Sequence, residues 1–157
     1  MVIKVIGMGC ENCDKLYENV MEAVKETGSD AVVEKVGDLM EIVKLIGGDV
    51  LPDDQKLILE IAKVIRVGFL QQNAFHKDDT CVPMEKQFKM MEIILYLYRK
   101  SRSLISMGMP MSVLKVDPIF DQVIAIKYDV PNDNLALLDE YKTKIDTFYE
   151  GVIERNA

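Results

Sequence analysis

The stretch LPDDQKLILEIAKVIRVGFLQQ, residues 51–72, decides the fold of most of this chain. Its apolar side chains recur every three or four residues, at Leu57, Ile61, Val64 and Ile65. This spacing places them on one face of a helix. Pro52 is tolerated in a first helical turn, and the helix dipole favours the carboxylates of Asp53 and Asp54 there. The stretch therefore predicts a long amphipathic helix that runs to about residue 72.

The same helical period continues along the rest of the chain. It predicts further helices at residues 38–46, 83–106, 118–128 and 134–153. Glycines stand where two of these helices should stop, at Gly47-Gly48 and at Gly108. After Gly37 there is no convincing strand pattern. The larger part of the chain is therefore predicted to form a helical bundle.

The N-terminus has a different pattern. A β-branched run at residues 2–6 ends in Gly-Met-Gly, which is typical of a buried strand followed by a turn. Helical spacing then runs from Glu11 to Gly28, and residues 31–36 form a second extended run. Two strands joined by a helix imply a parallel pair. The predicted fold class is α+β, mostly α: an N-terminal β-α-β unit joined to a C-terminal helical bundle.

Composition excludes several classes of function. The chain has 157 residues and a net charge of −7, with no basic stripe that could neutralise phosphates, so we expect no nucleic-acid partner. Its apolar runs are too short to cross a bilayer, and it begins without a secretory leader pattern. Three cysteines are too few for a secreted disulfide framework. We therefore expect a cytoplasmic protein without membrane insertion.

Cys10 and Cys13 form a Cys-x-x-Cys pair at the start of the first predicted helix. The positive end of a helix dipole stabilises a thiolate, so Cys10 is the candidate nucleophile and Cys13 the resolving thiol of a redox pair. The other interpretations are half of a zinc site or two small core residues. The remaining soft or imidazole ligands are His76 and Cys81, whose separation matches no known ligand pairing. We therefore predict no metal site.

Residues 1 to about 42, with IKVIGMGCENCDKLYENVMEAVKETGSDAVVEKV followed by DLMEI, resemble the first half of small archaeal thioredoxin-like, redox-active disulfide proteins. The resemblance implies a half-thioredoxin β-α-β unit and assigns the redox role to Cys10 and Cys13. In that family, a further pair of strands and a loop with a cis-proline face the cysteines. This sequence has no counterpart of them, so the resemblance predicts at most weak dithiol chemistry.

A second resemblance begins at residue 38 and covers roughly 115 residues. The segments LPDDQKLILEIAKVIR, FLQQNAFH, EKQFKM and IAIKYDVPND are similar to the C-terminal helical domain of the catalytic A subunit of archaeal A-type (V/A-type) ATP synthases. The resemblance implies a domain below the nucleotide domain, in contact with the rotor stalk. It makes Asn73, Ala74 and Phe75 the equivalents of an adenine-pocket edge. Gly68 departs from this pattern, because an acidic residue is usual there.

The chain lacks the residues that grip a triphosphate. A Walker A loop needs Gly-x4-Gly-Lys-Ser/Thr, and none of the 157 residues supply this pattern. We therefore expect no ATP hydrolysis by this chain and no cofactor. The two resemblances meet at residues 38–42, which indicates a gene fusion with a thioredoxin-like unit at 1–37 and a helical domain at 38–157.

The resulting functional hypothesis is a non-catalytic interaction or vestigial module derived from the catalytic chain of the synthase, with synthase subunits as candidate partners. The alternative is a thiol-disulfide oxidoreductase that uses Cys10 and Cys13. A two-stranded sheet has unpaired edges and is not stable by itself. We therefore also predict a homodimer formed through the exposed strand edges; the alternative is that the helices cover the sheet within one chain.

Overall fold

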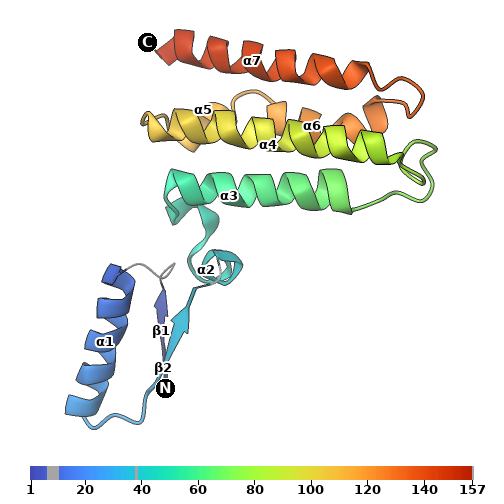
Figure 1. Cartoon of the computed structure of the whole chain (residues 1–157). Helices are drawn as coiled ribbons and strands as arrows, with labels where there is room; N and C mark the ends of the chain where they lie inside the picture. Colours follow the sequence, from blue (N-terminus) through green and yellow to red (C-terminus); the bar gives the residue numbers. More distant parts are fainter. Residues whose placement is uncertain (7–10, 38, 157) are drawn as a thin grey trace. The chain divides into compact units, whose positions relative to one another are not determined.

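The computed structural model describes residues 1–6, 11–37 and 39–156. They form two compact units, residues 1–51 and 52–157, and each unit is described by itself. The first contains a small parallel sheet, and the second is helical (Figure 1). The predicted α+β, mostly α fold class is confirmed. The proposed junction at residue 38 concerns the origin of the two segments and stays a prediction.

The first unit begins with strand β1 (Val2–Ile6), helix α1 (Glu11–Glu26) and strand β2 (Val32–Val36). The two strands pair in parallel, with Val2 opposite Val32 and Lys4 opposite Glu34. Helix α1 contacts both strands. Helix α2 (Leu39–Ile46) and a short 3-10 turn (Gly48–Val50) complete the unit. The strands and helices predicted for this segment are thus present. The 3-10 turn was not predicted.

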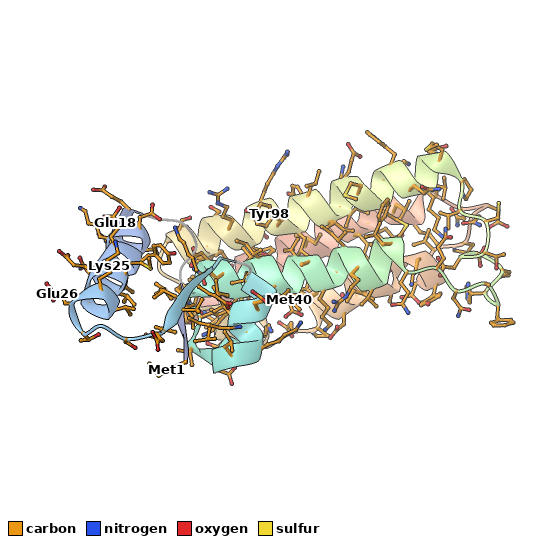
Figure 2. All side chains as sticks on the ribbon, turned by 90° about the horizontal axis from the view of Figure 1, so that it is seen from below. Met1, Glu18, Lys25, Glu26, Met40 and Tyr98 are labelled. Carbon is orange, nitrogen blue, oxygen red and sulfur yellow. The ribbon has the colours of Figure 1, made fainter. Side chains whose placement is uncertain are left out.

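Helix α1 has an exposed polar face and ends at a glycine. Glu18, Lys25 and Glu26, labelled in Figure 2, are all exposed. Gly28 has a φ of 60°, where an L side chain would be strained. Its N–H donates to the Lys25 carbonyl at 3.2 Å, and the next N–H donates to the Val24 carbonyl at 3.2 Å. These two bonds form a Schellman motif at the glycine where the sequence predicted the helix to end.

The sheet consists of two strands in the part of the chain that the structure describes. A single pair of strands has two edges whose backbone groups are open to further pairing. The predicted homodimer through these edges stays a prediction.

The second unit contains five α-helices and a π-helix among the described residues. These are α3 (Asp53–Lys63), the π-helix η2 (Val64–Leu70), α4 (Met84–Ser106), α5 (Met111–Leu114), α6 (Ile119–Asp129) and α7 (Leu137–Asn156). Helix α4 contacts α3, α6 and α7, and α6 packs on η2 (Figure 1). The long central helix α4 thus organises the bundle.

The core of this unit is built from the apolar positions that the helical period predicted. Leu57, Ile61 and Val64 are buried together with residues of every later helix of the unit, among them Ile93, Leu97, Leu114, Val123 and Ile145. The Tyr149 hydroxyl is also buried and pairs with the Ser101 hydroxyl. Burial raises the pKa of Tyr149 to about 12. A neutral, hydrogen-bonded phenol is therefore part of this core.

The predicted continuous helix from residue 52 to 72 is wrong in its second half. The α-helix ends at Lys63, and a π-helix follows to Leu70. Gly68 lies in this π-helix and is buried against α6, where an added Cβ would be 3.0 Å from the Ile124 Cα atom. The missing side chain therefore lets two helices approach closely. The last helix also starts later than predicted, at Leu137, after turns at residues 132–136.

Substitution of Gly68 by alanine tests this close approach. Alanine normally gains about 1 kcal/mol over glycine inside a helix, but overpacking a tight contact costs about 1–3 kcal/mol. We expect Gly68→Ala to lower the free energy of unfolding by about 1 kcal/mol in urea titrations. The matched control is Gly151→Ala in α7, where a Cβ meets nothing within 4 Å and the propensity gain should be realised. Equal stabilisation by both changes would contradict the tight contact.

Candidate functional site

The loop between η2 and α4, residues 71–83, carries the residues that the sequence singled out; we call it the aromatic loop. Phe75 is 99% exposed at this loop, while Asn73 is half-buried and Ala74 is exposed. The Asn73 side-chain oxygen accepts the Phe75 N–H at 3.0 Å, which closes a tight turn. The three predicted residues therefore belong to one turn that presents an aromatic ring to solvent.

Further hydrogen bonds hold this turn in shape from within. The Thr80 hydroxyl is 2.9 Å from the Ala74 carbonyl and 2.8 Å from the His76 carbonyl. The Asp79 carboxylate accepts the Asn73 N–H at 2.6 Å. The His76 ring packs edge-on against Tyr128 of α6, with ring centroids 4.9 Å apart. The aromatic loop is thus a folded substructure attached to the bundle.

Lys86, in the first turn of α4, is a buried anchor between the end of α6 and the loop. Its side chain is completely buried. The ammonium nitrogen lies 2.6 Å from the Val130 carbonyl, 3.1 Å from the Lys127 carbonyl and 3.4 Å from the Asp78 carbonyl. It also lies 3.0 Å from the side-chain oxygen of Asn132. One ammonium group therefore joins the aromatic loop to the end of α6 and to the turn before α7.

Lys127 of α6 is a second buried anchor, only 3% exposed. Its ammonium donates to the carbonyls of Val67, at 2.8 Å, and Gln71, at 2.6 Å. The Asp79 carboxylate lies 3.7 Å from the same nitrogen. The Lys127 ammonium group of α6 thus holds the π-helix and the start of the aromatic loop.

The electrostatic balance of this cluster follows from burial. Burial is the largest influence on Lys86 and lowers its pKa, while Asp78 and Asp79 act in the opposite direction. The backbone N–H of Asn132, 3.1 Å from the Asp78 carboxylate, lowers the pKa of Asp78. Two lysines and two aspartates therefore form a compensated group beneath the loop.

This arrangement suits a structural role better than phosphate binding. An ammonium group has three N–H donors, and the Lys86 ammonium has three acceptors at 2.6 to 3.1 Å. The Lys127 ammonium has two carbonyl acceptors, and the Asp79 carboxylate lies 3.7 Å away. Within the described residues, no buried side-chain nitrogen or oxygen lacks a hydrogen-bond partner. The lysines therefore hold the loop.

The predicted redox pair is only partly within the described structure. Cys13 is half-buried in the first turn of α1, whereas Cys10 lies outside the described residues. Cys81 is exposed in the aromatic loop, in the second unit. Among the residues that the structure describes, no three His, Cys, Asp or Glu side chains gather as metal ligands, and no helix has the length and hydrophobicity to cross a membrane.

The cluster of two lysines and two aspartates was not predicted from the sequence. Its signal is nevertheless present, because Lys86 is spaced by four, seven and eight residues from the core positions Met90, Ile93 and Ile94. Lys127 similarly follows the buried Ile126. A lysine within an apolar helical stripe is a candidate for a buried, fully bonded ammonium group.

Comparison with known proteins identifies relatives of this chain. The family described as the C-terminal domain of V and A type ATP synthase matches residues 7–114. The V-type ATP synthase alpha chain 2 of Clostridium tetani is 42% identical over 93 residues, which are 59% of this chain and 16% of that protein. The V-type ATP synthase alpha chain of Halothermothrix orenii is 42% identical over 92 residues, with the same shares of both chains. The matched part therefore spans about one sixth of these relatives.

Replacing Lys86 tests its anchoring role. Lys86→Met keeps the apolar stem but leaves several buried oxygens without their donor, which costs about 3 kcal/mol. We expect this loss in the free energy of unfolding, measured by urea titration. Lys89→Met on the same helix is the matched control, because Lys89 makes only long surface ion pairs of 3.9 and 4.0 Å. A loss below about 0.5 kcal/mol for Lys86→Met would contradict the anchor.

Proposed function

Because the chain belongs to the family of C-terminal domains of V- and A-type ATP synthases, we propose that it is a non-catalytic interaction module that associates with subunits of such a synthase. The observation that carries this proposal is Phe75, fully exposed on a loop that two buried lysines hold in place. An exposed aromatic ring on a preorganised loop is a suitable anchor for a partner protein, because little conformational entropy is lost on binding.

The same proposal assigns no ATP hydrolysis to this chain. Its 157 residues contain no Walker A sequence, and the buried lysines beneath the aromatic loop donate to protein carbonyls. Asn73, Ala74 and Phe75 are then the remnant of an adenine-pocket edge, retained as a protein-binding turn. The three N–H donors of Lys86 are taken by protein oxygens, so Lys86 has none to offer a phosphate at that turn.

Binding to a synthase is the direct test. We expect the chain to bind a purified V-type ATP synthase, or one of its separated subunits, in biolayer interferometry. Phe75→Ala should weaken this binding at least tenfold, since truncation of an aromatic anchor costs about 2 kcal/mol or more. Val116→Ala is the control, because Val116 is a 70% exposed apolar residue outside the loop. The proposal is refuted if the unaltered chain shows no binding at about 100 micromolar. Half-saturation at that concentration corresponds to a binding free energy of roughly −5.5 kcal/mol.

A thiol-disulfide oxidoreductase is the alternative function. It is supported by the position of Cys13 in the first turn of α1, behind strand β1 of a parallel β-α-β unit. The thioredoxin-like resemblance and the fusion belong to this alternative. Its attacking thiolate would come from Cys10.

Disulfide turnover separates the two functions. The oxidoreductase requires reduction of insulin disulfides by the dithiol form of the chain, and complete loss of this activity in Cys10→Ser. Cys81→Ser should leave the activity unchanged, because Cys81 lies in the other unit. For the interaction module we expect no turnover above that of free dithiothreitol. Turnover that depends on Cys10 would favour the alternative.

A further inference from the structure

Helix α4 exposes an apolar face that nothing in the described structure covers. Met84, Phe88 and Leu95 are 80%, 66% and 43% exposed, and Met91 between them is half-buried. These four residues follow one another at intervals of four, three and four positions, which places them along one side of the helix. We call them the outer face of α4. An apolar strip of this kind on a charged bundle indicates a contact surface.

Charges of opposite sign lie in the two halves of α4. Glu85 and Glu92 lie in the N-terminal half of α4, and Arg99 and Arg102 lie in its C-terminal half; all four are exposed. Within the described part of the chain, the acids have only long surface ion pairs, 3.9 Å from Lys89 to Glu85 and 3.8 Å from Lys142 to Glu92. Neither arginine makes an ion pair with another described residue.

We propose that the outer face of α4 binds a second copy of this chain, with the two α4 helices antiparallel. A twofold axis near Leu95 sets Glu92 of each copy opposite Arg99 of the other. Glu85 and Arg102 then lie within about one helical turn of each other across the interface. A parallel arrangement would oppose like charges. The face is thus complementary to itself in one orientation only.

The surface beside this face offers room for the contact. A groove of about 350 Å³ runs between α4 and α7, and its lining includes Phe88, Met91, Leu95 and Arg99. With the axis near Leu95, Phe88 of one copy lies about one helical turn from Arg99 of the other, which allows a cation–π contact. The apolar strip of each copy then lies along the C-terminal half of the other α4.

The size of the face sets the strength of the association. Residues 84–102 span about 27 Å of helix. One helix face covers less than the roughly 800 Å² per partner of a stable standard interface. We therefore expect a weak, reversible dimer. It uses the second unit, so it differs from the homodimer predicted through the strand edges, and it does not depend on synthase binding.

Charge exchange between copies tests the arrangement. Sedimentation equilibrium with reducing agent, from about 10 micromolar to about 1 millimolar, should show a dimer whose fraction rises with concentration. Glu92→Arg and Arg99→Glu should each weaken self-association at least tenfold, because each opposes like charges across the axis. An equimolar mixture of these two variants should restore the dimer as a heterodimer, since both variants then meet an opposite charge again.

The controls keep the result decisive. Glu150→Arg, an exposed charge reversal on α7, should leave the dimer unchanged, and circular dichroism should show that every variant keeps its helices. A wild type that stays monomeric throughout overturns the proposal. So does a dimer that neither reversal weakens, which would assign self-association to another surface such as the strand edges. A third outcome would also overturn the proposal: the unaltered chain stays monomeric and Arg99→Glu loses synthase binding. This outcome would assign the face to the synthase.

Discussion

The buried ammonium group of Lys86 is the interaction on which the loop end of the bundle depends. Apolar packing holds the helices together, but it has no direction and does not fix the loops between them. The Lys86 ammonium is directional, and its acceptors come from the aromatic loop, the end of α6 and the turn before α7. The desolvation that burial imposes on this charge is offset by those bonds and by Asp78 and Asp79. One side chain thereby joins two connections, the aromatic loop and the turn between α6 and α7.

This constraint explains how a fully exposed phenylalanine can serve as a recognition element. The aromatic loop has few apolar anchors of its own, and Phe75 contributes none because its ring is in solvent. Without the two lysines, the entropy cost of ordering the loop would fall on the binding step. With them, the ordering is complete before binding. The proposal of an interaction module therefore rests on the buried charges as much as on the exposed ring.

The sequence predicted what apolar periodicity controls and missed what buried charge controls. Helices α3, α4, α6 and α7 follow from repeating core positions, since their buried side chains repeat with the helical period. The two strands follow from their β-branched runs. The π-helix was not predicted from the sequence. Its Gly68 contacts Ile124 of α6, a helix far away in the sequence, and apolar periodicity does not reveal such a contact. Lys86 was missed because lysine is rarely buried. The position of Phe75 depends on the helices around the loop and on the buried lysines beneath it. The sequence therefore located the loop but not the lysines that hold it.

The two surfaces of the second unit differ in physical character, and this makes them separable. The aromatic loop presents a neutral ring, so binding through Phe75 should depend little on ionic strength. The outer face of α4 carries glutamates and arginines at its ends, and exposed charges are screened over about 10 Å at roughly 0.1 M salt. Added salt therefore weakens the orientation of the α4 contact while leaving its apolar strip. A contact made by the loop and a contact made by α4 thus respond differently to the same change of solvent, although they begin only a few residues apart.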